Sequence, residues 1–306
     1  MNCRKLMKTT ARLICVCLFL FILVLSFGGF QQAFAEEKFE DTLDRIKRTG
    51  VFNLGVREAT YPYGYVDANN NYVGFSTDIA RKVHERLEKE LKRSIKLNYV
   101  VVTGRTRIPL LLNRRIDLEA GATVITKGRT KVVDFSVPFF TTATMIVVPK
   151  ESPIRKLQDL AGKRVGIPSG GLEERMYRSF NDSGRINPSV KTIGYEDHPE
   201  GFQALITGAI DAYSSDGPIL YAMRQKASDP GKWRIFDPKV NVFLQAFPMR
   251  EQSSKFKNIV DHTIVELFES GKWQELFNKY FGPQSKSPYA MTEGLKFLKI
   301  MNSWPQ

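Results

Sequence analysis

Short apolar segments alternate with amphipathic segments along the chain, and this alternation predicts strands that are followed by helices. Residues 51–56 and 96–102 are short, apolar and rich in β-branched side chains, as buried strands are. Between them, a turn rich in Asn and Asp at 67–71 precedes a predicted helix that Ser76 or Thr77 could cap. Apolar residues four apart would share one face of this helix, namely Ile79, Val83, Leu87 and Leu91. Strands and helices in alternation indicate an α/β fold with a parallel, helix-covered sheet.

The same alternation continues toward the C-terminus. The further strands that we expect cover residues 118–123, 142–149, 163–168, 189–195, 211–215 and 240–247. The further helices that we expect cover residues 107–114, 156–160, 172–180, 201–207, 218–226, 256–268 and 272–281, with a weaker helix at 292–300. One series of βα units is therefore followed by a second series of similar design.

The restart of the pattern predicts two lobes, one inserted in the other. Lobe 1 would comprise residues 36–145 together with 243–306, and lobe 2 would comprise residues 146–242. The strands at 142–149 and 240–247 would cross between the lobes. The polar tail beyond Pro283 is expected to pack on the first lobe.

The first 35 residues have the layout of a secretory signal peptide. A basic start precedes an almost wholly apolar run at 13–27, and Ala33-Phe34-Ala35 forms a small-x-small cleavage site. The apolar run is short for a membrane-spanning helix, which needs about 20 residues. We therefore expect cleavage after Ala35 and a periplasmic protein; an uncleaved N-terminal anchor is the alternative.

Cysteine and charge exclude several classes of function. Cys3, Cys15 and Cys17 all lie in the leader, so a cleaved chain has no disulfide, no cysteine-ligated zinc and no thiol nucleophile. The leader holds four of the 45 Lys and Arg residues and none of the 32 acidic residues, so the remaining chain stays basic. Its cations are scattered among acids and form no patch, which argues against nucleic-acid binding. There is no phosphate loop, no G-x-S-x-G elbow and no H-E-x-x-H motif, and we expect no cofactor and no metal.

A set of spaced positions within residues 107–140 forms a motif more specific than a single glycine pattern. It consists of Asp117, Gly121, Thr123, Arg129, Phe135-Ser136 and Pro138-Phe139. This motif resembles the core of the periplasmic solute-binding proteins that serve amino-acid importers. Further runs extend the resemblance over the whole mature chain, to the glutamate/aspartate-binding subfamily. They are Gly55-Val56-Arg57-Glu58, Arg107-Ile108-Pro109-Leu110-Leu111, Asp197-His198 and Ser215-Asp216.

The resemblance implies a fold and a partner. The fold is the two-lobed periplasmic binding protein fold of type II, in which each lobe is a helix-covered, mostly parallel sheet and two crossover strands join the lobes. The function is a non-catalytic receptor that closes on a polar, acidic amino acid and delivers it to the permease of an ABC importer in the inner membrane. A monomer is expected.

The resemblance also assigns ligand-binding roles. Arg129 would hold the α-carboxylate and Asp216 the α-ammonium, although Arg129 alone could be a solvated residue and Asp216 a helix cap. Arg57, Arg107 and His198 would receive the side-chain carboxylate. Arginine suits these roles because its planar guanidinium holds a carboxylate through two parallel hydrogen bonds. Thr123 and Gly171 complete the predicted ligand-binding set.

The Ser169-Gly170-Gly171 turn lies between a strand and a helix, where free N–H groups favour an anion. Threonine is usual where Gly171 stands, so a plain glycine turn is nearly as good an interpretation. Gly104, Ala122 and Val124 stand where the subfamily tends to have hydroxyl residues. The ligand is therefore either glutamate or aspartate held differently, or a related anion with a larger apolar part.

An enzyme on the same scaffold, such as a periplasmic cyclohexadienyl dehydratase, is the rival interpretation. It would require a general acid with a raised pKa beside the substrate. Glu119 and Glu174 are the candidates that the sequence offers, and both have simple structural roles available. A sensor domain is disfavoured. The run Asp67-x-Asn69-x-Asn71 resembles a calcium loop, but Tyr72 stands where glycine is needed, so a hairpin turn explains it better.

Overall fold

The computed structural model describes residues 40–304 of the chain. The stretch Asp41–Gln306 is one compact unit. The predicted signal peptide, with its cleavage site and the three cysteines, lies outside the described residues. No helix within residues 40–304 combines the length and the apolar character that crossing a membrane requires.

The first of two large sheets within the described residues has the strand order β5-β1-β6-β14-β7. Its strands are β1 (Val51–Val56), β5 (Lys96–Val101), β6 (Leu118–Ala120), β7 (Asp134–Phe135) and β14 (Pro248–Met249). Strands β5 and β6 lie parallel to β1 on either side, and Val56 is in register with both Val101 and Ala120. The loops after these three strands therefore leave the sheet at the same edge, which is where α/β folds place ligands.

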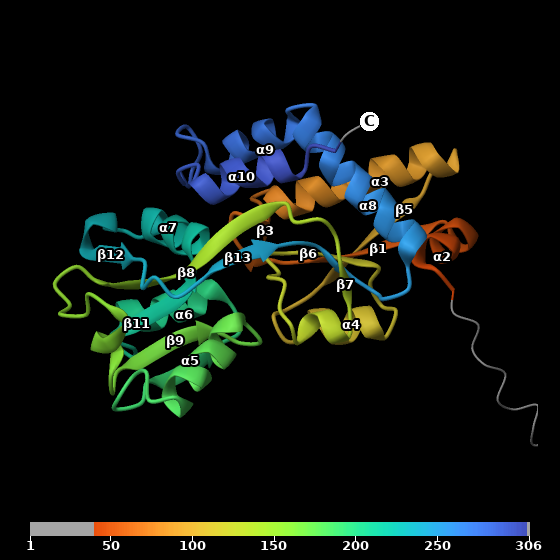
Figure 1. The fold of residues 1–306 in the computed structure, drawn as a ribbon. Helices are drawn as coiled ribbons and strands as arrows, with labels where there is room; N and C mark the ends of the chain where they lie inside the picture. Colours follow the sequence, from red (N-terminus) through yellow and green to blue (C-terminus); the bar gives the residue numbers. More distant parts are fainter. Residues whose placement is uncertain (1–39, 305–306) are drawn as a thin grey trace, which may run out of the picture. The chain divides into compact units, whose positions relative to one another are not determined.

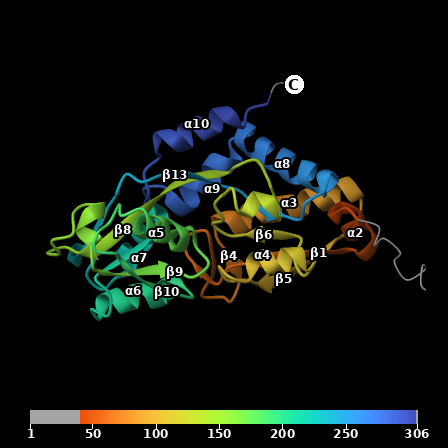
Figure 2. The same cartoon turned by 60° about the horizontal axis from the view of Figure 1, so that its bottom comes forward.

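The second large sheet has the order β10-β9-β11-β8-β12. Its strands are β8 (Phe140–Pro149), β9 (Arg164–Pro168), β10 (Lys191–Tyr195), β11 (Ala212–Asp216) and β12 (Trp233–Phe236). Strands β9, β10 and β11 are parallel, β8 runs antiparallel to them, and β12, which is antiparallel to β8, runs in the same direction as β9, β10 and β11. The carboxyl ends of β9, β10 and β11 form a second candidate edge for a ligand. Figure 2 shows β9 and β10 in one half of the fold and β1 and β5 in the other.

Two strands connect the halves, as the sequence predicts. Strand β8 and strand β13 (Val242–Gln245) pair antiparallel, with Val242 beside Ala143 and Gln245 beside Phe140. Figure 1 shows the two strands running side by side between the sheets. The fold is thus a two-lobed α/β fold with two crossover strands.

Helices cover both sheets. In Figure 1, α3 and α8 lie on one side of the first sheet and α4 on the other, while α7 lies opposite α5 and α6 in the second half. The α-helices are α2 (Thr42–Thr49), α3 (Phe75–Leu91), α4 (Arg107–Leu112), α5 (Leu172–Asp182), α6 (His198–Ile206), α7 (Gly217–Lys226), α8 (Ser254–Glu269), α9 (Lys272–Phe281) and α10 (Glu293–Met301). Short 3₁₀ helices are η2 (Arg129–Lys131), η3 (Leu157–Leu160) and η4 (Pro230–Lys232).

The first half has a core rich in aromatic side chains. Phe75 packs within 5.2–6.2 Å, ring centre to ring centre, of Phe139, Phe281 and Trp273. Trp273 also donates from Nε1 to the carbonyl of Phe139 at 2.9 Å, which satisfies its polar atom inside the core. Helix α10 buries Leu295 and Leu298 in this cluster, so the prediction that the tail packs on the first half is confirmed.

A small hairpin takes the place of the apparent calcium loop. Strands β3 (Gly64–Val66) and β4 (Tyr72–Val73) pair antiparallel, and β2 (Ala59–Thr60) pairs with β3. Asp67 Oδ1 accepts hydrogen bonds from the amides of Asn69 and Asn71, each at 2.9 Å. Asp78, a further carboxylate that the apparent calcium loop would require, instead accepts from the Tyr280 hydroxyl at 2.6 Å. The hairpin prediction is confirmed.

Helices α3 and α6 begin earlier than predicted, as do α7 by one residue and α8 by two. Helix α3 starts at Phe75 after Gly74, so Ser76 and Thr77 are buried in its first turn and do not cap it. Gly74 has φ +136°, and a Cβ there would lie 2.3 Å from the Tyr63 carbonyl, so glycine is needed at this start. Helix α6 begins at His198 with Asp197 as its cap.

The strand boundaries also differ from the prediction in places. Strand β6 ends at Ala120, before the polar loop that was assigned to it. Strand β12 was not predicted, because it is four half-buried residues with an arginine in the middle. That residue, Arg234, donates to the carbonyls of Ser152 and Ile154, each at 2.9 Å, which holds the strand at the sheet edge.

Candidate functional site

The candidate site is a pocket where the strand-end loops of the two sheets meet. Its wall includes six of the seven predicted ligand-binding residues: Arg57, Arg107, Arg129, Gly171, His198 and Asp216. Its volume is about 50 Å³, which leaves room for only a few waters. The pocket is therefore in a closed arrangement, and a larger ligand would need the halves to separate slightly.

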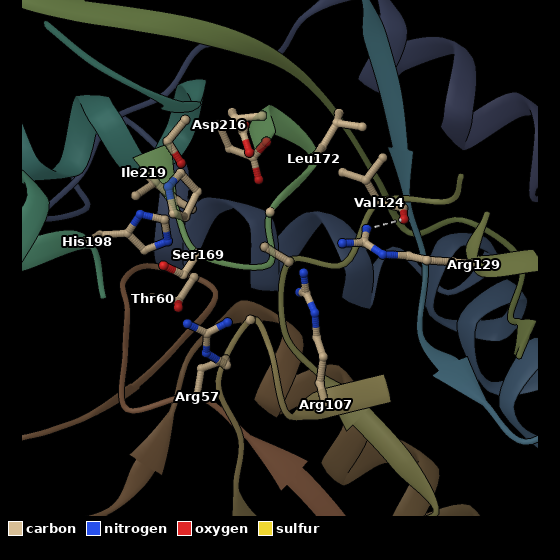
Figure 3. A pocket seen from close by; sticks show the side chains of 16 residues that line it. Arg57, Thr60, Arg107, Val124, Arg129, Ser169, Leu172, His198, Asp216 and Ile219 are labelled. Carbon is tan, nitrogen blue, oxygen red and sulfur yellow. Dashed lines mark hydrogen bonds between the residues drawn. The ribbon is translucent and has the colours of Figure 1, made fainter. Parts of the chain in front are cut away.

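Three arginines project into the pocket from the first half. Arg57 follows β1 directly, Arg107 is the first residue of α4 and Arg129 is the first residue of η2. Their exposed fractions are 9%, 6% and 7%, respectively. Figure 3 shows their guanidinium groups pointing toward the side that carries Ser169 and His198.

Hydrogen bonds fix two of these arginines. Arg107 Nη1 donates to Thr123 Oγ1 at 2.6 Å, and the same hydroxyl donates to Glu119 Oε2 at 2.5 Å. Arg129 Nη1 donates to the Val124 carbonyl at 2.8 Å. Thr123 thus lies behind Arg107 and orients it, rather than lining the pocket itself.

The second half supplies the opposing wall. The Ser169-Gly170-Gly171 turn connects β9 to α5, and Gly171 is the N-cap of that helix. The Gly170 carbonyl accepts from Arg129 Nη2 at 3.3 Å and from Arg107 Nη2 at 3.5 Å. These bonds join the two walls across the pocket. A ligand carboxylate would compete with this carbonyl for the same donors.

Gly104 makes the close contact of the walls possible. A Cβ at this position would lie 2.2 Å from the Ser169 carbonyl, closer than any van der Waals contact allows. Next to it, Arg105 Nη2 donates to Ser169 Oγ at 3.2 Å. There is therefore a steric reason why position 104 is glycine, where the subfamily tends to have a hydroxyl residue.

Burial lowers the pKa of the cationic groups. Burial, and secondarily the neighbouring Arg107, lowers the pKa of Arg57 to about 10, and burial and Arg107 lower the pKa of Arg129 to about 9. Both guanidinium groups remain charged at neutral pH. Burial, with help from Arg57 and Arg107, lowers the pKa of His198 to about 3. His198 is thus a neutral hydrogen-bonding group here, with Nδ1 3.1 Å from the Tyr213 hydroxyl.

Two acids face these cations. Asp216 ends β11 and accepts from Gln245 Nε2 at 3.0 Å, which ties it to crossover strand β13. Burial raises its pKa well above the ordinary range, and the nearby Glu173 adds to this shift. Glu173 lines the pocket, and burial raises its pKa to about 6.

Glu173 is the ionisable pocket residue that the sequence interpretation missed; Thr60, Leu172 and Ile219 are further lining residues that it did not name. Of the two acids nominated from the sequence, Glu174 accepts from the Gly170 amide at 3.0 Å and Glu119 from the Thr123 hydroxyl, and neither is among the residues that line the pocket. Part of a signal was present, because helix side chains tilt toward the N-terminus, and α5 begins at the pocket. This tilt applies equally to Glu173 and Glu174 in the first turn, so it could not select between them.

The sequence profile described as "Bacterial extracellular solute-binding proteins, family 3" matches residues 52–283. The chain belongs to this family. This solute-binding protein is 33% identical over 242 residues to the L-glutamate/L-aspartate-binding protein of Pseudomonas aeruginosa, covering 78% of the chain and 80% of the relative. It is 30% identical over 260 residues to the glutamate/aspartate import solute-binding protein of Escherichia coli, covering 85% of each.

Solved structures match this solute-binding protein as well. The P235GK mutant of the arginine-binding protein ArgBP from T. maritima superposes with a TM-score of 0.70 at 27% identity, covering 78% of this chain and 98% of that one. An ancestral amino-acid-binding protein, AncCDT-1, described as a precursor of cyclohexadienyl dehydratase, has a TM-score of 0.68 at 25% identity and covers 78% and 99%. This protein is accordingly a solute-binding protein for amino acids, from a family of periplasmic substrate-binding components of ABC importers.

Proposed function

We propose that this solute-binding protein binds an acidic amino acid, glutamate or aspartate, and delivers it to the permease of an ABC importer. The observation that carries the proposal is the set of three buried arginines opposite Asp216 in one pocket. A buried charge without a partner is costly, so such a cluster favours a ligand that brings negative charge. The similarity to glutamate/aspartate-binding proteins supports the same ligand class.

The charges of the pocket suggest how the ligand lies. Arg129 would bind the α-carboxylate, and Asp216 the α-ammonium. Arg57 and Arg107 would bind the side-chain carboxylate, with neutral His198 as an additional hydrogen-bond donor. A neutral amino acid would leave one guanidinium buried without an anion, and a cationic one would add repulsion.

Closure of the two lobes around the ligand is part of the proposal. The lobes would be residues 36–145 with 243–306 and residues 146–242, with β8 and β13 as the crossover between them. Domain closure around a ligand is an established switching mode. We further propose that cleavage after Ala35 releases the protein as a periplasmic monomer that presents its ligand to the permease subunits.

Calorimetric titration tests the ligand class. Glutamate or aspartate should bind more tightly than glutamine or arginine, and Arg57→Met, Arg107→Met and Arg129→Met should each lower affinity for the acidic ligand by about 30-fold or more, as losses of buried charge partners do. Arg129→Met should weaken the binding of every amino acid equally. Arg57→Met and Arg107→Met should instead reduce the ratio of glutamate affinity to glutamine affinity. Arg178→Met, at an exposed arginine of α5 outside the pocket wall, is the matched control. Tighter binding of glutamine or arginine would contradict the proposal.

Glu173 favours one second candidate, the periplasmic enzyme. Dehydratase chemistry requires a general acid whose pKa lies near the working pH, and Glu173 is a pocket acid with a pKa of about 6. The similarity to AncCDT-1 is compatible with this candidate. Product formation from prephenate or arogenate, lost in Glu173→Gln, would establish the enzyme; thermal stabilisation by glutamate without turnover of either compound would favour the receptor.

A further inference from the structure

We propose that Glu173 contacts the bound ligand in its protonated form, so that the pair Glu173–Asp216 holds one proton in the complex and ligand binding depends on pH. The inference rests on the proposed function, because it requires an acidic amino acid in the pocket. It assigns to Glu173 a role in ligand specificity that the sequence interpretation did not give it.

The position of the carboxyl group is the first argument. Glu173 is 4% exposed and lines the pocket from the first turn of α5. A Cβ placed on Gly171 would lie 2.7 Å from Glu173 Oε2. The carboxyl group therefore occupies the space that a side chain at position 171 would take, beside the Ser169-Gly170-Gly171 turn.

Three residues of the pocket wall provide no side-chain hydrogen-bond donor. Gly171 carries no side chain, and Ala122 and Val124 offer no hydroxyl from the opposite wall. A protonated carboxyl group has one O–H donor, whereas a carboxylate can only accept. Glu173 can thus donate to a ligand carboxylate only when it is protonated.

The neighbouring acid is the second argument. Glu173 shares the pocket with Asp216, and the interaction of the two carboxyl groups raises the pKa of Asp216. A ligand carboxylate beside Glu173 would add a further negative charge, and a cluster of buried like charges is costly in a medium of low polarity unless Glu173 is neutral.

The groups around Glu173 act in both directions. Burial disfavours the charged form of Glu173, and the interaction with Glu173 raises the pKa of Asp216 at the end of β11. The backbone amide of Glu173 itself, followed by Arg129 of η2 and Arg107 of α4, favours the charged form, and Thr144 Oγ1 of β8 lies 3.5 Å from Oε1. Two tyrosines also face Glu173, namely Tyr213 of β11 and Tyr177 of α5. Burial outweighs the two arginines, so the pKa of Glu173 rises to about 6.

Ligand binding decides where the proton lies. Two interacting carboxyl groups titrate as a pair. An α-ammonium beside Asp216 favours its charged form, and a ligand carboxylate beside Glu173 favours the neutral acid. The complex therefore holds its single proton on Glu173. Below about pH 6 the free pair holds two protons, so ligand binding releases one. At alkaline pH the free pair holds none, so ligand binding takes one up. The affinity for the ligand therefore falls at both extremes of pH.

Calorimetry from pH 5 to pH 8.5 tests the inference. It measures the glutamate affinity of the full chain without its leader. With a pKa of about 9, Arg129 loses only about a quarter of its charge by pH 8.5, and this loss is common to the wild type and Glu173→Gln. The wild type should lose affinity toward pH 8.5, by up to tenfold per pH unit once the free pair has lost its last proton. Glu173→Gln keeps a neutral donor, so it should bind within a few-fold of the wild type at pH 7 and lose less affinity toward pH 8.5. Glu173→Ala removes the donor and should bind about tenfold more weakly at pH 7.

The outcomes separate this inference from the proposed function. Identical alkaline profiles of wild type and Glu173→Gln, or unchanged affinity in Glu173→Ala, would overturn the role of Glu173 while leaving an acidic-amino-acid receptor intact. Absence of glutamate and aspartate binding at every pH would overturn the proposed function, and this inference with it. Circular dichroism of both variants establishes that they are folded, and repeating the titrations in buffers of different ionisation enthalpy counts the protons exchanged.

Discussion

The ammonium group of Lys226 lies 3.6 Å from the centre of the Tyr61 ring and 5.8 Å from that of Tyr65. Lys226 belongs to α7, which packs on the second sheet, whereas the tyrosines belong to the hairpin region of the first half. The contact therefore joins the two halves outside the pocket wall. Tyr61 and Tyr65 also contact each other, with ring centres 4.7 Å apart. Tyr61 and Tyr65 thus have a structural role in the closed arrangement.

Lys226→Met should weaken ligand binding about two- to fivefold, because cation–π contacts at partly exposed sites contribute ~0.5–1 kcal/mol. Thermal stability of the ligand-free protein should stay nearly unchanged if the contact forms only on closure. The matched control is Arg224→Met, which removes a cation 5.0 Å from Tyr221 on the same helix and so breaks no contact between halves. Equal effects of the two substitutions on affinity would contradict a closing role for Lys226.

The buried neutral state of His198 predicts acid sensitivity of the fold. Its pKa of about 3 lies below the ordinary value of 6.5, so the unfolded chain binds a proton that the folded state does not. Stability from this group is present above pH 6.5 and is lost as the pH falls toward 3. In the ligand-free protein, lowering the pH from 7 to 4.5 should reduce the free energy of unfolding of the wild type by about 2–3 kcal/mol more than that of His198→Gln. Urea unfolding at both pH values measures this shift, and a constant difference would show that His198 is not buried as described.

Local patterns predicted most of the fold. Strand β1 and helix α9 have the predicted bounds, because their apolar residues alone determine them. The start of α6 was missed although Asp197 caps it through the amide of Glu200 at 2.9 Å, a signal that was available in the sequence. Strand β12 had no such signal, since its stability depends on pairing with β8.

Part of the candidate site was likewise predictable from the sequence, and part was not. Arg57 follows β1 directly and Asp216 ends β11, so their convergence at the strand-end edge was predictable. Thr123 belongs to the same motif, but its orienting role depends on the side chain of Arg107. The pKa of Glu173 depends on burial by both halves, which no local pattern records. Neighbouring acids in the sequence, Glu173 and Glu174, could not be distinguished without the helix direction.

The Asp117 carboxylate should be among the most important polar groups of the first half. It is fully buried, pairs with Arg45 and accepts from the amide of Asn53 at 2.7 Å. Burial raises the pKa of Asp117 despite the opposing effect of Arg45. Asp117→Ala leaves Arg45 without this partner, so the free energy of unfolding should fall by about 3–5 kcal/mol.

The comparison for Asp117 is the surface pair Lys255–Asp44, whose side chains are 61% and 46% exposed. Asp44→Ala should cost less than about 1 kcal/mol, because solvent screens exposed pairs. Chemical unfolding of both variants measures the contrast. Similar losses in the two variants would contradict the assignment of Asp117 as a buried structural anchor.

Gly104→Ser tests whether the missing hydroxyl or the missing side chain matters at this position. Adding a hydroxyl donor would be expected to strengthen binding if donors alone limited affinity. The structure predicts the opposite, because any Cβ would lie 2.2 Å from the Ser169 carbonyl and would keep the walls apart. Glutamate affinity should therefore fall at least tenfold, while the ligand-free melting temperature changes little. Ala122→Ser adds a hydroxyl to the same pocket at a residue that already has a Cβ, and it should bind as well as the wild type or better. Tighter binding by Gly104→Ser would show that the contact between Gly104 and Ser169 is not part of the ligand-bound state.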